Sequence, residues 1–129
     1  MRSFAVALLL GVLLLPGLAA AQYYAHVDIT CDTPTVMQGE YACFTISFDH
    51  NLVGQHPVVL EVYVEGPGGG YWLQGVYDIT LRWCGDQSRE DCVLIPDCAP
   101  LGEYTFNVFL YSQNGYLADQ DSCTIEVVG

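Results

Sequence analysis

The chain has 129 residues, of which 15 are acidic and only three are basic, and its formal net charge at pH 7 is −12. This charge excludes nucleic acid and anionic lipid as expected partners, because Lys and Arg are needed to bind phosphate groups. It suits a soluble protein, or one whose partner is cationic, calcium included.

The first 21 residues have the features of a secretory signal peptide. Arg2 supplies a positive start, residues 4–15 form an apolar run, and three alanines at 19–21 form a small-residue cleavage site. The run is shorter than the roughly 20 residues of a membrane span. We therefore expect a signal peptide at 1–21 and a single domain at 22–129, with no membrane span, in a secreted, periplasmic or cell-surface protein.

Apolar and polar residues alternate through most of this domain, which predicts short strands and no long helix. Turn residues such as Pro34, Gly39 and Pro57 separate the strands. Residues 85–91 are charged and are expected to form a loop. The strands expected in this part of the chain are 23–30, 41–49, 58–65, a short one at 71–73, 76–84 and a short one at 92–95.

The strand expected within 100–111 has the clearest alternation in the chain. A turn at 113–115 joins it to a last strand at 122–128, so the two strands form a hairpin. Its outer face carries Phe109 and Tyr111, which are aromatic where a solvent-facing strand is usually polar. The inward positions of all strands predict a core of Ile29, Phe44, Ile46, Leu60, Val62, Ile79, Leu81, Tyr104, Phe106, Val108, Ile125 and Val127.

Seven to eight short strands separated by turns predict an all-β, two-sheet antiparallel sandwich. Its motifs are Thr35-Val36-x-x-Gly39, Phe44-x-Ile46-x-Phe48 and Pro100-x-Gly102-x-Tyr104-x-Phe106. On these motifs the chain resembles the immunoglobulin-like and fibronectin-III-like modules of secreted and bacterial envelope proteins. It departs from true immunoglobulin domains because Ile46 and Phe106 stand where the inter-sheet cysteines would be. A fainter similarity, to the MD-2-related lipid-recognition sandwiches, implies a lipid-binding alternative.

All six cysteines lie in the expected domain, and an even number behind a signal peptide predicts three disulfides in an oxidising compartment. None of them has the spacing of a zinc site. Bridged residues must lie close together, so we pair cysteines that flank one loop, face inward on the first and last strands, or lie at one end. The expected pairs are Cys84–Cys92, Cys31–Cys123 and Cys43–Cys98, and Cys31–Cys43 is a rival.

No residue pattern supports catalysis, so we expect no enzyme and no resident cofactor. There is no Gly-x-Ser-x-Gly motif, and His26, His50 and His56 are expected in solvent. Calcium is the one possible metal, because it prefers oxygen ligands and acidic loops are expected to meet at one end of the sandwich. The alternative is that these side chains are only solvated. The candidate calcium ligands are Asp49, Asn51, Asp86, Glu90, Asp91, Asp119 and Asp121.

Exposed aromatic residues predict a binding face, since Tyr and Trp are common anchors of interfaces. We expect a non-enzymatic binding, adhesion or envelope-structural module with an unidentified protein or glycan partner. The alternatives are a sandwich that binds lipid or another small ligand, and a carbohydrate-binding module. The candidate binding residues are Tyr63, Tyr71, Trp72, Phe109 and Tyr111.

Overall fold

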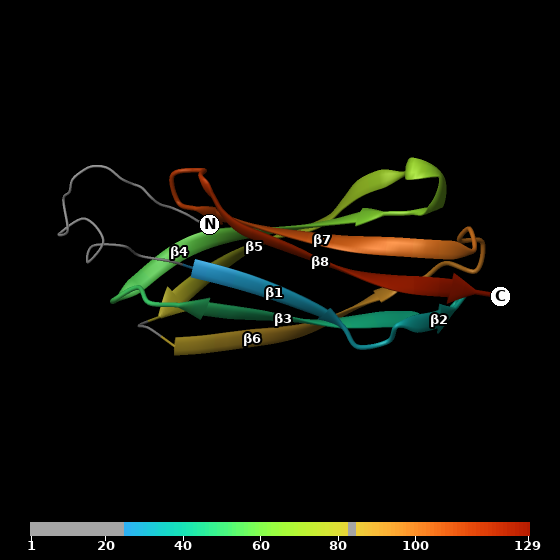
Figure 1. The fold of residues 1–129 in the computed structure, drawn as a ribbon, viewed down its shortest axis with the longest axis horizontal. Helices are drawn as coiled ribbons and strands as arrows, with labels where there is room; N and C mark the ends of the chain where they lie inside the picture. Colours follow the sequence, from blue (N-terminus) through green and yellow to red (C-terminus); the bar gives the residue numbers. More distant parts are fainter. Residues whose placement is uncertain (1–24, 83–84) are drawn as a thin grey trace, which may run out of the picture.

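The computed structural model describes residues 25–82 and 85–129, without the side chains of residues 72, 73 and 85. These residues form an all-β immunoglobulin-like sandwich of two sheets (Figure 1). A short 3₁₀ turn, Pro67–Gly69, lies between β4 and β5. One sheet has the strand order β1-β3-β6, with β1 at Ala25–Cys31, β3 at Tyr41–His50 and β6 at Gly85–Leu94. The other sheet has the strand order β2-β8-β7-β4-β5, with β2 at Thr35–Met37, β8 at Leu117–Val128, β7 at Gly102–Ser112, β4 at Gln55–Glu65 and β5 at Tyr71–Arg82.

Inward-facing residues of both sheets fill the space between the layers. The Phe44 ring packs edge-on against Phe106, with 5.3 Å between ring centroids. This aromatic pair links the two sheets through burial, with no disulfide at its position. Of the core expected from the sequence, only Ile79 is partly buried, and the other eleven residues are buried.

A buried tyrosine fixes the entry into β7. The hydroxyl of Tyr104 donates a hydrogen bond to the carbonyl of Pro100 at 2.7 Å. This contact is the tyrosine corner of immunoglobulin-like folds. Burial raises the pKa of Tyr104, so the hydroxyl keeps the proton that it donates.

The structure corrects the expected loop at 85–91. These residues begin β6, which pairs with β3 from Gly85 opposite His50 to Leu94 opposite Tyr41. β6 is an edge strand and most of it is exposed, so it carries polar residues on both faces and lacks the alternation of a half-buried strand. The last strand is also longer than expected and begins at Leu117.

The expected loop at 85–91 also led to wrong disulfide pairs. Cys43 lies directly opposite Cys92 in the β3–β6 register and is bonded to it. The expected pairs Cys43–Cys98 and Cys84–Cys92 are therefore wrong, because Cys92 lies within a strand and not at the end of a hairpin loop. Cys98 is an exposed free thiol, and Cys84 lies outside the described residues.

Two carboxylates of β8 bind the free edge of β1. The backbone N–H of Val27 donates to Asp119 Oδ2, and that of Ile29 donates to Asp121 Oδ2, each at 2.9 Å. β1 is an edge strand whose other side pairs with β3. The carboxylates thus accept two backbone donors that the sheet itself leaves unpaired.

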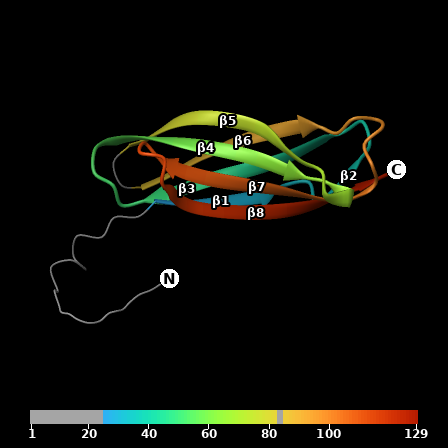
Figure 2. The same ribbon diagram turned by 90° about the horizontal axis from the view of Figure 1, so that it is seen from above.

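A disulfide continues this series. Cys31 is bonded to Cys123, as expected, and both residues lie two positions beyond the last hydrogen-bonded pair. All three contacts join residues 92 positions apart, so the two strands run in one register. We call the three contacts the β1–β8 links; Figure 2 shows these two strands together along one side of the sandwich.

The two disulfides of the described residues, Cys31–Cys123 and Cys43–Cys92, are typical of a protein from an oxidising compartment.

No helix in the described residues is long and apolar enough to cross a membrane.

The β1–β8 links generate a prediction about stability. Replacing Asp119 or Asp121 with Ala leaves a backbone donor without its acceptor, and each change should lower the free energy of unfolding by about 1–3 kcal/mol. Urea unfolding measures this quantity. Asp78→Ala, which removes an exposed carboxylate of β5, is the control. Losses no larger than that of the control would contradict the role of the links.

Candidate functional site

Four aromatic side chains lie side by side on the outer face of the five-stranded sheet. Tyr71 stacks on Tyr63 with ring centroids 5.1 Å apart and an interplanar angle of 12°. Tyr63 meets Phe109 edge-on at 5.7 Å, and Phe109 lies 6.5 Å from Tyr111 at 28°. We call Tyr71, Tyr63, Phe109 and Tyr111 the aromatic row.

Strand alternation places the aromatic row outside the core. On β7, Val108 and Leu110 are buried, so Phe109 and Tyr111 project from the opposite face. β4 pairs directly with β7, which brings Tyr63 beside Phe109. The expectation that Tyr63, Phe109 and Tyr111 lie on outward faces of neighbouring strands is confirmed, and the structure adds Tyr71 to the same face. The side chain of Trp72 lies outside the described part, and the role of these residues in binding stays a prediction.

The row is partly open to solvent and is acidic at its centre. Tyr71 is 52% exposed, and the other three rings are half-buried. The Tyr63 hydroxyl donates to Glu61 Oε1 at 3.1 Å, and this bond, ahead of burial, raises the pKa of Tyr63. Burial raises the pKa of Tyr71, with a smaller effect from Glu65. Both hydroxyls thus remain donors at neutral pH.

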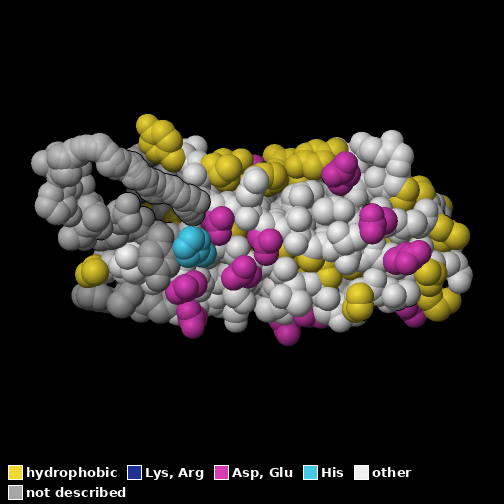
Figure 3. Space-filling model, in the orientation of Figure 1, with side chains coloured by type: hydrophobic (Ala, Val, Ile, Leu, Met, Phe, Trp, Pro, Cys, Tyr) yellow, Lys and Arg dark blue, Asp and Glu magenta, His cyan; other side chains and the backbone are white. Residues whose placement is uncertain are grey.

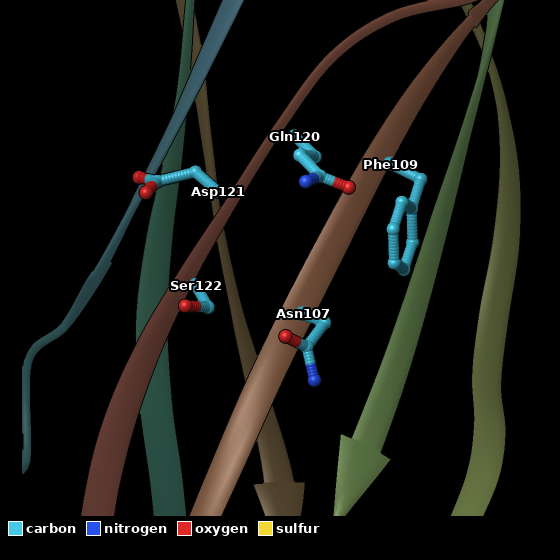
Figure 4. A pocket seen from close by; sticks show the side chains of 5 residues that line it. All are labelled: Asn107, Phe109, Gln120, Asp121 and Ser122. Atoms are coloured by element: carbon cyan, nitrogen blue, oxygen red, sulfur yellow. The ribbon is translucent and has the colours of Figure 1, made fainter.

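A shallow polar hollow of about 280 Å³ lies beside the row. Asn107 from β7 and Gln120 and Ser122 from β8 line it, next to Phe109 (Figure 4). In the same view Asp121 points away from them, toward β1, where it accepts the Ile29 hydrogen bond. The hollow therefore offers amide and hydroxyl groups beside an aromatic surface.

Both arginines of the described residues lie on edge strands, Arg82 on β5 and Arg89 on β6, which run near each other at the side of the sandwich away from β1 and β8. Arg89 lies over the Tyr77 ring, 4.3 Å from its centroid, and the Tyr77 hydroxyl donates to Asp91 at 3.0 Å. Burial, and then this hydrogen bond, raise the pKa of Tyr77. The backbone N–H of Arg82 donates to the Gln87 side chain at 3.0 Å. We call these contacts the β5–β6 seam.

Acidic side chains are spread over the face shown in Figure 3, and no Lys or Arg is visible on it. Asp49 and Asp86 face each other across β3 and β6 and, with Asp28, line a hollow of about 380 Å³. Glu90 lies further along β6, opposite Thr45 of β3.

Three of the other candidate calcium ligands accept hydrogen bonds within the protein. Asp119 and Asp121 accept backbone hydrogen bonds from β1, and Asp91 binds Tyr77. Of the seven candidates, all except Asn51 lie on strands. They were expected in loops that meet at one end of the sandwich, and that placement is wrong. Among the described residues no group of three or more His, Cys, Asp or Glu is arranged to hold a metal ion. Calcium binding stays a prediction.

One histidine also departs from its expected place. His50 is 2% exposed, because it ends β3 on the inward face, and its Nδ1 accepts the backbone N–H of Leu52 at 3.2 Å. His26 is exposed, with Nδ1 3.4 Å from Asp119, and His56 binds the Val53 carbonyl.

An apolar groove of about 650 Å³ opens where β6 ends beside β4 and β7. Core residues Val64, Tyr104 and Phe106 line its depth, and Leu94 and Cys98 lie at the exposed side.

Glu61 and Asn107 belong to the candidate surface but were not among the residues predicted from the sequence. Both could have been found from their parity, since Glu61 lies two residues before Tyr63 and Asn107 two residues before Phe109. Their positions beside the aromatic rings depend on strand pairing, which places Glu61 opposite Phe109.

No protein-family model matches the sequence, and no curated protein matches it significantly. Solved structures do resemble the fold. A CARDB domain from Pyrococcus furiosus, solved in complex with di-metal ions, has a TM-score of 0.64 and 13% identity over 82% of this chain and 89% of its own. A β-glucosidase from Erythrobacter marinus has a TM-score of 0.67 and 11% identity over 82% of this chain.

A DNA glycosylase from Pseudomonas fluorescens, bound to DNA with an abasic site analogue, gives a TM-score of 0.64 and 15% identity over 88% of this chain. This chain spans only 32% of that glycosylase and 16% of the β-glucosidase. Identities this low establish a likeness of fold alone. The shared fold is the immunoglobulin-like sandwich.

The β5–β6 seam predicts a specific cost at Gly75. A Cβ at this position would lie 2.8 Å from the Tyr77 hydroxyl oxygen and 3.0 Å from Cζ. Gly75→Ala should push the ring off Asp91 and Arg89 and lower the free energy of unfolding by about 1–3 kcal/mol. The same change in a Tyr77→Ala background should cost much less. Urea unfolding of the four proteins tests this, and equal costs in both backgrounds would refute it.

Proposed function

We propose that this protein is a secreted, non-enzymatic binding module whose contact surface is the outer face of the five-stranded sheet. The observation that carries the proposal is the aromatic row, four contiguous rings on a sheet face that neither the other sheet nor any described element covers. Aromatic residues are enriched in protein interfaces, where large rings supply contact area at low entropic cost.

The expected route to the cell exterior agrees with this role. Residues 1–21 would be removed as a signal peptide, and residues 22–129 would fold as one disulfide-bonded domain in a secreted, periplasmic or cell-surface location. The CARDB domain has a similar fold and covers a similar length, which suits an independent module. The contact that we propose needs no cofactor, because its groups are rings, hydroxyls and carboxylates.

Ring orientation favours a protein partner over a sugar. Nearly parallel rings with centroids 5.1 Å apart must overlap, because coplanar rings at that separation would clash. Tyr63 and Tyr71 therefore cover part of one face of each other, whereas a sugar-stacking platform needs flat, open faces. The edges and hydroxyls of these two residues and the rings of Phe109 and Tyr111 remain for a partner, and they suit the mixed surface of a protein.

The apolar groove supports a second candidate function, the binding of a small apolar ligand. Pockets that bind drug-sized ligands have volumes of about 300–1,000 Å³, and the groove has about 650 Å³. Tyr104 supplies a polar group at its wall. Such a ligand would leave the aromatic row free, so the two functions can be separated by mutation.

Removing two rings should abolish the proposed contact. Tyr63→Ala combined with Tyr111→Ala should reduce capture of the native partner by tenfold or more, because central interface tyrosines each contribute about 1–2 kcal/mol. The measurement is quantitative mass spectrometry of proteins retained from the native extracellular extract. Thermal unfolding verifies that the variant is folded.

Tyr41→Ala combined with Tyr116→Ala is the matched control, since these tyrosines are 61% and 73% exposed and lie outside the row. The control should retain its partner. If the row variant is folded and retains every specifically captured protein, the outer face is not the contact surface.

A further inference from the structure

The apolar groove lies beside the end of β6, where the three-stranded sheet stops. β6 ends at Leu94, and the residues from there to Pro100 turn toward β7 without joining a sheet. Pro96 cannot donate to a sheet ladder, which suits the end of a strand. These residues form one wall of the groove, and core side chains of β4 and β7 form its depth. The groove therefore reaches from the surface to the core.

Among the described residues that line the groove, none carries a charged side chain. Ile95 and Ala99 of its wall are 4% and 7% exposed, and the partly buried Val93 packs beside them. A charged group of either sign would lose water here without gaining an opposite charge. An uncharged apolar molecule has no such cost and gains by burial.

Several hydrogen-bond donors of the wall are already used within the protein. The backbone N–H groups of Ile95 and Ala99 donate to carbonyls of the chain at 2.9 and 3.1 Å. The Tyr104 hydroxyl donates to the carbonyl of Pro100. Pro96 and Pro100 have no N–H to offer. A carboxylate or sulfonate, which only accepts hydrogen bonds, would therefore find few donors in the groove.

The arginines of the described residues do not make the groove suitable for an anion. Arg89 lies over the Tyr77 ring, 4.3 Å from its centroid. Arg82 is the last residue of β5, whereas Gln74, which lines the groove, lies near the start of that strand. The formal net charge of −12 also repels anionic ligands from the whole molecule.

We propose that the apolar groove binds an uncharged apolar molecule and discriminates against amphiphiles with a charged head. This inference rests on the second candidate function, the binding of a small apolar ligand, and names the charge class of that ligand. The volume of about 650 Å³ admits a molecule of drug size.

The first test compares two fluorescent probes with the same aromatic skeleton. N-phenyl-1-naphthylamine is uncharged at pH 7, and 8-anilino-1-naphthalenesulfonate carries a sulfonate. The uncharged probe should show a saturable rise in fluorescence, and the sulfonate should bind about fivefold more weakly or worse. The preference should persist in about 1 M NaCl, where the screening length is about 3 Å, because it comes from the groove lining.

The second test displaces the uncharged probe with three amphiphiles that share a ten-carbon chain. Decanol should displace the probe, whereas decanoate and decylammonium should each need about threefold higher concentration or more. These three compounds separate the effect of the apolar chain from the effect of either charge.

Methyl NMR spectra locate the bound decanol. The methyl signals of Val64, Val93 and Ile95, which line the groove, should shift on titration. The methyl signals of Val27, a buried residue of β1 outside the groove, should stay in place.

Two variants at one exposed position of the groove complete the test. Cys98→Trp adds a large ring to the wall and should weaken decanol binding about threefold or more, because the ring would occupy part of the groove. Cys98→Ser keeps the size of the side chain and should bind decanol as the natural protein does. Thermal unfolding verifies that both variants are folded.

Each contrary result has its own meaning. Absence of saturable binding by the probe and by decanol would overturn both the inference and the second candidate function. Equal binding of the sulfonate or decanoate, tighter binding of decylammonium, or a preference that disappears in 1 M NaCl would overturn the charge class alone. Unchanged binding by folded Cys98→Trp, or methyl shifts confined to other residues, would overturn the groove as the site. Partner capture through the aromatic row is measured separately.

Discussion

The free edge of β1 is the constraint on which the rest of the sandwich depends. An unpaired edge leaves backbone donors without acceptors and offers a template for pairing with another chain. Here carboxylates from the other sheet accept the Val27 and Ile29 donors, and a disulfide continues the series in the same register. Side chains of β8 therefore close this side of the molecule without an additional strand.

The opposite side is closed by different chemistry. Polar residues of β6 face the gap between the sheets, where Asp91 and Arg89 both contact Tyr77. Inward-pointing charges on an edge strand also discourage pairing with another chain. With side-chain contacts at both sides, the outer faces of the sheets are the extended surfaces that remain, and the aromatic row lies on one of them.

Much of this arrangement followed from strand parity. Phe106 and Val108 were expected in the core and are buried, and Tyr63 and Phe109 were expected outside and lie on one face. Parity failed for β6, because an exposed edge strand has no apolar face to mark it. The Cys43–Cys92 pair was missed for the same reason. The stacking of the rings depends on side-chain conformations set by neighbouring strands, which no sequence pattern records.

Hydrogen exchange of individual backbone amides tests the central claim, that side chains of β8 close the edge of β1. The Val27 and Ile29 amides should exchange as slowly as amides in the paired strands, although no described strand is paired with β1 through its backbone on that side. Exchange at these two positions as fast as in the exposed turn at 113–116 would show that the edge is open and would contradict the account.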